Sequence, residues 1–461
     1  MLERINRSHL FEEVYCLILC AVSIACWEFI PGYGIGVILL IGAASILLLK
    51  DIKYAIACVP NFLFVINDGF SSSQVPIFVL IFGGLFIGVL IYYFIKNGFQ
   101  MKKAKSGKAL LIMSVFSFLP LLWHNIIPEG MEVLYAVYAS YLGYFIIYIL
   151  FAAGLKKNCF SILVSAFSYI GILLTFECAF YLFDYFTTHA FNDMSEFYYH
   201  LGWGICNEAG IMMCFSLPFI FIQIAKSKTL KKVFLSCIKL AIVFVGICIT
   251  TSRGAFIFGL LEMLVLAIWS VVFAKKHRLT LAFMVLGFIV VLAIIEYGFG
   301  ISRAIQLIKQ ITFSNGLESS GRFYLYERAC QLWKTNNLTM IFGNGIVAEM
   351  AVSNTYYGAI ETFVVYHSTF FEALACFGVV GLLCGLLHLY EKYKLAFKFD
   401  KAMAGIITIG FIFVDLYGLI DNTYGMYYYM IPLVIIMGVI DNVEPGSDYE
   451  LYTRSKKKNL N

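Results

Sequence analysis

Long apolar runs separated by short polar connections make up most of the chain. Each run has about 17 to 25 residues, which as a helix is about enough to cross a hydrocarbon core of ~30 Å. The run at 52–66 is short and contains Pro60, and the two runs beside Arg253 share a very tight hairpin. The predicted spans are 14–30, 33–49, 52–66, 75–95, 109–127, 133–151, 159–183, 205–224, 233–250, 254–273, 279–298, 368–390, 402–420 and 423–440. The pattern predicts an all-α, polytopic membrane protein with about 14 transmembrane helices.

The composition agrees with this pattern. Hydrophobic residues make up 61% of the chain and charged residues 13%, which a soluble domain cannot carry. We find no internal repeat, so we expect one polytopic transmembrane domain over residues 1–441 and a basic cytoplasmic tail over 442–461. The 13 cysteines lie mostly in the spans, which indicates packing, and no compact set of metal ligands occurs. Neither a metal nor a cofactor is expected.

Basic residues alternate between the two sides of the predicted membrane domain. If the N-terminus is cytoplasmic, every basic cluster lies on the inner side, as the positive-inside rule requires. The clusters are at 4–7, 50–53, 96–108, 156–157, 226–232, 275–278, 392–401 and 454–458. We therefore expect both termini in the cytoplasm, and the net charge of +5 reflects topology and not nucleic-acid binding.

The longest polar segment, 299–367, is predicted to lie outside the membrane on the extracytoplasmic face. Isoleucines recur at helical spacing from Ile301 to Ile311, and Phe323, Tyr326 and Ala329 repeat the same spacing further along. A large, partly helical extracytoplasmic loop is therefore expected. Ser319 or Ser320 would cap its second helix and place Arg322 in the first turn.

Two groups on the outer face are candidates for chemistry. Arg253 lies at the outer ends of two spans, where an arginine either reaches lipid phosphates and carboxylates or binds an anionic substrate. Its planar guanidinium suits phosphate because it donates two parallel hydrogen bonds. His367 is predicted in the first turn of the span that follows, where the positive helix terminus favours a neutral ring able to accept a proton. The other interpretation is an ordinary interfacial histidine.

A set of short motifs on this face resembles the family of O-antigen ligases and O-antigen or capsular polysaccharide polymerases. The resemblance covers about Trp203 to Gly381 and depends on the order of the motifs. They are Gly202-Trp203-Gly204 followed by Asn207, Thr251-Ser252-Arg253-Gly254-Ala255, Gly321-Arg322 leading to Gly343-Asn344-Gly345, and His367 with Glu372 and Gly378.

The resemblance implies transfer of glycan from an undecaprenyl diphosphate carrier, without a nucleotide sugar or a required metal. It implies that Arg253 and Arg322 engage the donor diphosphate and that His367 is the functional histidine, so that 299–367 is a catalytic loop. Two residues depart from the ligase pattern, because Ser368 stands where ligases commonly have Asn and Tyr326 where Trp is frequent. Further substrate-binding candidates are Arg328, Trp203, Asn207, Tyr326 and Glu372.

We therefore expect a polymerase that joins oligosaccharide repeat units in the bacterial plasma (inner) membrane. The alternative within the family is a ligase that transfers the lipid-linked glycan to a lipid, protein or wall acceptor. The expected partners are the undecaprenyl diphosphate-linked oligosaccharide, membrane lipids, and the chain-length regulator and flippase of the same pathway. A flippase or transporter is a further interpretation. Such proteins usually have internal pseudo-symmetry and ionisable residues along a path through the membrane. Here no internal symmetry occurs, and the main carboxylates inside spans are Glu177, Glu262 and Asp415.

Overall fold

The computed structural model describes residues 9–68, 76–122, 140–155, 159–188, 199–227, 229–273, 322–345 and 366–443, which form helices and connections and contain no strand. Seven of these helices are long and apolar enough to cross a membrane. They are α2 (His9–Phe29), α5 (Ile77–Asn97), α9 (Phe160–Thr188), α10 (Cys206–Lys226), α11 (Leu230–Ile249), α12 (Arg253–Phe273) and α17 (Thr369–Ala396). The all-helical fold class is thus confirmed, whereas the count of about 14 spans is not. The predicted span 279–298 lies outside the described residues.

Shorter helices occupy most of the other predicted spans. They are α3 (Gly34–Leu49), α4 (Lys53–Phe64), α6 (Lys108–Phe116), α8 (Ser140–Gly154), α18 (Lys401–Tyr417) and α19 (Tyr427–Asn442), with 3-10 turns at Met101–Lys103 and Leu119–Leu122. The span expected at 109–127 is wrong in its described part, because α6 ends at Phe116 and a 3-10 turn containing Pro120 follows. Proline lacks the backbone N–H of a continuing helix and disfavours helical geometry at Leu119 before it.

The centre of the bundle is formed by α9 and α10. In the most apolar stretch of each helix, 89% and 83% of the residues are buried. Helix α10 packs against α9, α11, α12 and α18. Close packing depends on small residues: a Cβ atom at Gly210 would lie 2.3 Å from the Cβ of Ala255, and one at Gly246 would lie 2.1 Å from Thr175 Oγ1. In an apolar environment the hydrophobic effect does not drive helices together, so small residues that let the backbones approach closely favour their association. This packing fixes the start of α12, and with it Arg253.

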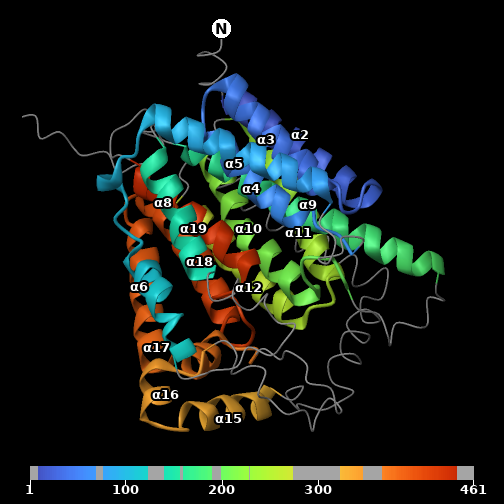
Figure 1. The fold of residues 1–461 in the computed structure, drawn as a ribbon. Coiled ribbons are helices and arrows are strands. Elements are labelled where there is room, and N and C mark those ends of the chain that lie inside the picture. Colours follow the sequence, from blue (N-terminus) through green and yellow to red (C-terminus); the bar gives the residue numbers. More distant parts are fainter. Residues whose placement is uncertain are drawn as a thin grey trace, which may run out of the picture.

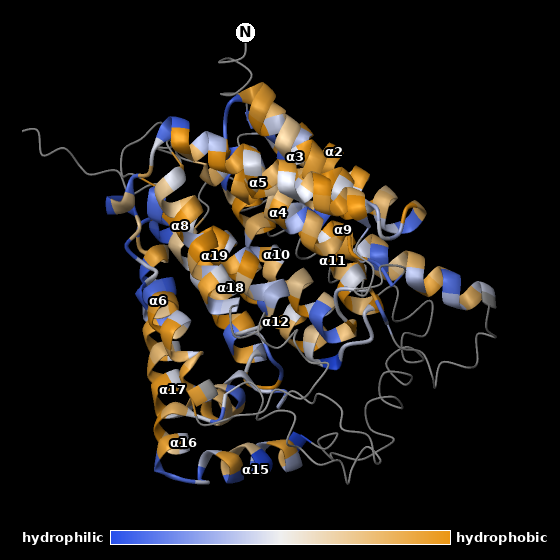
Figure 2. Cartoon of the chain, in the orientation of Figure 1, coloured by the Kyte–Doolittle hydropathy of each residue, from blue (hydrophilic) through white to orange (hydrophobic). Residues whose placement is uncertain are grey.

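Surface helices expose apolar side chains. Leu80, Ile81 and Ile95 of α5 are 60–80% exposed, and Leu383 and Leu386 of α17 are similarly exposed. Figure 2 shows these helices as mainly hydrophobic, whereas α15 (Arg322–Trp333) alternates hydrophilic and hydrophobic residues. Such outward apolar faces suit a lipid environment, so the described helices form a multi-pass membrane protein.

The two ends of the bundle carry different groups. At one end, where α10 and α19 finish and α18 begins, Lys226 pairs with Asp400, and Lys398 Nζ lies 2.8 Å from Asp441 Oδ1. The backbone N–H of Lys105 also donates to Asp441. At the other end lie the hairpin before α12 and the start of α17. The predicted inner basic clusters that the structure describes here therefore gather at one end, away from Arg253 and His367.

The described part of the long polar segment forms two short helices, α15 and α16 (Asn337–Phe342), which pack against α17 (Figure 1). Arg322 is the first described residue of α15, so its position in a helix agrees with the sequence, whereas the predicted start of that helix lies outside the described residues. The predicted caps Ser319 and Ser320 and the isoleucine repeat of 301–311 lie outside the described residues.

An interruption in α17 provides hydrogen-bond acceptors for the segment that follows α15 and α16. Gly378 has φ +60°, which interrupts the helical hydrogen bonding. The carbonyls of Ala375 and Cys376 accept instead from the N–H groups of Asn344 (2.9 Å) and Gly345 (2.8 Å). The Asn344 side chain also donates to Leu332 O at the end of α15. The Gly343-Asn344-Gly345 motif therefore completes the hydrogen bonding of a broken helix.

We expect Gly343→Ala to destabilise the protein by about 1–3 kcal/mol, because position 343 combines positive φ with tight backbone contact. Gly343 has φ +77°, and an added Cβ would lie 2.3 Å from the backbone of Cys376. The melting temperature of detergent-purified protein measures the effect. Gly88→Ala is the matched control, because a Cβ there meets no atom within 4 Å. Equal melting temperatures for the two variants would contradict the role of the motif.

Candidate functional site

The connection between α18 and α19, residues 418–426, forms the floor of the candidate site. It is tied to the start of α17, because Thr369 N donates to Gly418 O (2.8 Å) and Thr423 N donates to Thr369 Oγ1 (3.1 Å). Tyr428 of α19 donates its hydroxyl to Asn422 O at 2.7 Å. This connection, called here the α18–α19 turn, is thus held by hydrogen bonds from both neighbouring helices.

Asp421 in the α18–α19 turn lies between two of the predicted site residues. Its side chain is buried, and its Oδ1 lies 3.2 Å from His367 Nδ1. Its Oδ2 lies 3.7 Å from Arg322 Nη2. The backbone N–H of Asn422 donates to Oδ1 at 2.8 Å, which fixes the carboxylate. Asp421 therefore joins His367 and Arg322 in one charged cluster.

The sequence predicted His367 in the first turn of a helix. In the structure it lies just before α17. Helix α17 begins at Thr369 after the N-cap residue Ser368, and His367 itself has φ +50°. A positive φ is uncommon for residues other than glycine, although histidine is among those that adopt it more often. An Nδ1–H that donates to the carboxylate leaves Nε2 as the proton-accepting nitrogen.

Tyr326 holds the backbone of His367. Its hydroxyl donates to His367 O at 3.1 Å, and its ring stacks on Phe371 with centroids 4.4 Å apart. Burial raises the pKa of Tyr326, although Arg322 nearby opposes the shift, so the hydroxyl stays protonated and able to donate. Tyr326, a predicted substrate-binding residue, thus contacts the backbone of His367.

Arg322 projects from the first turn of α15 onto the α18–α19 turn. Its Nη1 donates to Ile420 O at 2.5 Å, in addition to the ion pair with Asp421. About a quarter of the side chain is exposed. Since a guanidinium has five N–H donors, an anion that approaches the exposed side could still receive hydrogen bonds from it.

Arg253 reaches the same end of the bundle from the hairpin between α11 and α12. Ser252 Oγ donates to Asn207 Oδ1 (2.7 Å) and lies 3.4 Å from Tyr417 OH, and a Cβ at Gly254 would lie 2.8 Å from the Tyr417 ring. Tyr417 O accepts the N–H of Asp421, so the hairpin packs against the base of the α18–α19 turn. Arg253 itself is exposed.

The remaining candidates are placed differently from one another. Asn207 anchors the Arg253 hairpin through Ser252. Arg328 is partly exposed on α15, about two turns from Arg322, with Gln331 Oε1 at 3.4 Å from its Nη1. Glu372 lines a cavity along α17.

The side chain of Trp203 is buried beside the site. It is only 3% exposed, donates its Nε1–H to Glu177 Oε2 at 3.0 Å, and packs edge-on against Phe64. Its carbonyl accepts the hydroxyl of Tyr427 in α19, so the described contacts of Trp203 are with the protein core.

Sequence reasoning missed two carboxylates. One is Asp421, and the other is Glu208 in the first turn of α10, which interacts electrostatically with Asp421 and His367. The signal for Asp421 was its position in the polar run Asp421-Asn422-Thr423 between two predicted spans, on the same face as Arg253 and His367. Within the described residues, no three His, Cys, Asp or Glu side chains form a group that could hold a metal ion.

The fold and this site define a multi-pass membrane protein with arginines, a histidine and a carboxylate gathered at one end of its helices. The model of a family described as O-antigen ligase matches residues 238–386, about one third of the chain. This match confirms the resemblance inferred from the sequence motifs and relates the protein to membrane enzymes of O-antigen and related polysaccharide biosynthesis. The matched segment includes Arg253, Arg322 and His367, whereas Asn207 and Asp421 lie outside it. A comparison with curated proteins found no match.

The orientation of the site end is open to a direct test. We expect Lys334→Cys, exposed between α15 and α16, to react with a membrane-impermeant thiol reagent in intact cells, and Lys102→Cys, exposed near the opposite end, to react only after lysis. Both variants are made in a background that lacks the native cysteines. The reverse labelling pattern would show that the site faces the cytoplasm.

Proposed function

We propose that the protein is a membrane glycosyltransferase that polymerises oligosaccharide repeat units from an undecaprenyl diphosphate carrier into a cell-surface polysaccharide. The observation that carries the proposal is the His367–Asp421–Arg322 cluster beside the Arg253 hairpin, most of it within the segment that matches the O-antigen ligase family. The proposal places the protein in the bacterial plasma membrane, with both termini cytoplasmic and 299–367 as the extracytoplasmic catalytic loop of the domain 1–441.

The chemistry that such a transfer requires agrees with these residue types. A hydroxyl of the acceptor sugar attacks the anomeric carbon of the donor, a new glycosidic C–O bond forms, and the C–O bond to the diphosphate breaks. The bonding electron pair leaves with the diphosphate, which gains negative charge. In the proposal Arg253 and Arg322 stabilise that charge with hydrogen bonds whose donors are already in place.

His367 is the proposed general base. Its Nε2 accepts the proton of the acceptor hydroxyl while the glycosidic bond forms. Asp421 is a positioning residue, because it holds Nδ1–H and stabilises the imidazolium that results. Tyr326 has a similar indirect role through the His367 carbonyl. Arg328 and Glu372 are proposed contacts to the glycan or its carrier.

The cluster also has a structural role, because Arg322 and Asp421 bind the α18–α19 turn through Ile420 O and Asn422 N. Paired and buried charges of this kind occur without catalysis. Activity and stability measured on the same variants distinguish the two interpretations.

We expect His367→Ala to lower polymer formation by about 10²–10⁴-fold, as loss of a general base does, and Asp421→Asn by about 10²-fold. The measurement is the amount of polymer made by cells that carry each variant at matched expression, together with the melting temperature of the purified protein. Asp184→Asn, an exposed acid on α9, is the matched control. Wild-type activity in either site variant, or a loss that only follows unfolding, would reject the assigned roles.

The ligase is the second candidate, because the family that matches is described as O-antigen ligase. Polymerase and ligase share the donor and differ in the acceptor. We expect a strain that lacks the gene to carry single repeat units on its carrier or anchor, and the wild-type gene to restore a ladder of polymer lengths on a gel. Accumulation of long polymer on the lipid carrier in the null strain would identify a ligase instead. Movement of lipid-linked glycan without a new glycosidic bond would indicate a transporter.

A further inference from the structure

A cavity of about 290 Å³ lies beside α17 and extends from the candidate site towards the opposite end of the helix. Thr369 and Glu372 line it near the site, and His388 and Asp415 line it about four helical turns further along. The wall between is apolar and includes Met113, Leu382 and Leu386. Because Leu386 is also 62% exposed, the cavity communicates with the apolar surroundings of the helix bundle.

The far end of the cavity is polar but electrically balanced. Lys392 is fully buried, and its Nζ lies 2.5 Å from Asp415 Oδ1 and 2.6 Å from Tyr424 OH. Tyr393 donates its hydroxyl to the other oxygen of Asp415 at 2.6 Å. One positive and one negative charge thus satisfy each other here. A charged ligand group would have no counter-charge in this cluster, whereas a neutral group would pay no such penalty.

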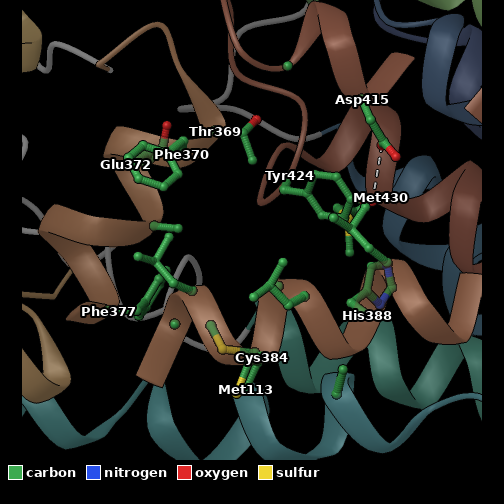
Figure 3. Close-up of a pocket in the computed structure, with 18 of the residues that line it drawn as sticks. Met113, Thr369, Phe370, Glu372, Phe377, Cys384, His388, Asp415, Tyr424 and Met430 are labelled. Carbon is green, nitrogen blue, oxygen red and sulfur yellow. Dashed lines mark hydrogen bonds between the residues drawn. The ribbon is translucent and has the colours of Figure 1, made fainter. Parts of the chain in front are cut away.

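Two polar groups near this end have no hydrogen-bond partner among the described residues, the Tyr429 hydroxyl and the His388 ring, and of these His388 lines the cavity. It is 4% exposed and lines the cavity, and neither ring nitrogen has a hydrogen-bond partner among the described residues. Its ring contacts Tyr424 edge-on with centroids 5.3 Å apart. Figure 3 shows His388 and Tyr424 on the side of the cavity away from Glu372 and Phe370. Buried polar atoms without hydrogen-bond partners are rare in proteins, so the His388 nitrogens indicate that a ligand with a hydrogen-bonding group binds in the cavity.

We propose that this cavity binds a neutral lipid with a single hydroxyl group, with the hydroxyl against His388 and the hydrocarbon chain along α17. A hydroxyl both donates and accepts hydrogen bonds, so it can pair with either nitrogen of an imidazole. A file of water molecules fits less well, because water needs two to four polar partners and the wall of the cavity is mainly apolar. The inference concerns a second ligand and does not depend on the proposed transfer reaction.

The hydrocarbon chain of the glycan donor would not satisfy these observations. A donor bound by Arg253 and Arg322 has its diphosphate at the site end, and a hydrocarbon tail that reached His388 would bring no hydrogen-bonding atom. The lipid proposed here therefore differs from the donor in two ways. Its head group is a neutral hydroxyl, and that head group lies at the His388 end of the cavity and not at the site end.

The test uses the full-length, detergent-purified protein and two photoreactive probes. One is a long-chain primary alcohol with a diazirine in its chain, and the other is its methyl ether, which accepts a hydrogen bond but cannot donate one. We expect the alcohol to label peptides of α17 and α6 with about tenfold preference over the ether, the effect of one buried hydrogen bond. His388→Leu should abolish the preference while labelling by the ether persists. His388→Phe, which keeps a ring next to Tyr424, is the second variant if His388→Leu does not fold.

A cavity-filling variant supplies an independent arm. Gly385 lines the cavity, and a Cβ there meets no atom within 4 Å, so Gly385→Leu should lower labelling by both probes without a clash. Gly88→Leu on α5 is the matched control, because its Cβ also meets no atom within 4 Å and the residue does not line the cavity. Equal labelling by alcohol and ether in wild type, a preference that survives both His388 variants, unchanged labelling in Gly385→Leu, or displacement of the alcohol by excess undecaprenyl diphosphate would each overturn the proposal.

Discussion

Burial of the Asp421 carboxylate constrains how the site end of this protein is built. A carboxylate removed from water is stable only when charged or hydrogen-bonding groups surround it. The groups that do so come from segments far apart in the chain: His367 before α17, Arg322 at the start of α15, and the N–H of Asn422 in the α18–α19 turn. The need to satisfy one buried charge therefore relates the positions of His367 and Arg322, two of the three side chains to which we assign catalysis.

The break in α17 provides the second constraint. In apolar surroundings a helix cannot leave carbonyls unpaired, so the interruption at Gly378 requires donors from elsewhere. Asn344 and Gly345 supply them, and through Asn344 the end of α15 is held as well. Helix α15 is thus fastened at its last turn by the break in α17 and at its first turn by Arg322 on the α18–α19 turn. With both ends held, Arg322 is positioned before any substrate arrives, which is the condition for electrostatic stabilisation at low reorganisation cost.

The elements could be predicted from sequence to the extent that they depend on local apolar pattern. Most of the long runs in the described residues form helices, the tight hairpin at Arg253 is present, and Arg322 lies in a helix. Side-chain partners between distant segments could not be predicted, because no periodicity relates Asp421 to His367. Trp203 shows the converse: the sequence offered it as a substrate-binding candidate, but its side chain is buried and its indole N–H donates to Glu177. His367 was misplaced by two residues because its positive φ cannot be read from the sequence.

Two polar clusters lie near the two ends of α17, and they differ in the balance of their charges. At the cluster beside His388, Lys392 forms an ion pair with Asp415. The hydroxyls of Tyr393 and Tyr424 also donate hydrogen bonds to the Asp415 carboxylate. Such a cluster has little attraction for an ion and is suited to a neutral group beside His388. At the site end, Arg322 uses only part of its five-donor fork on Asp421 and Ile420, and the exposed Arg253 lies at the base of the same turn. Arg322 pairs with Asp421, so an anion that engaged Arg322 would share the guanidinium with this carboxylate. Under the proposed function the donor diphosphate would be that anion, and Asp421 would keep its contact with His367 Nδ1.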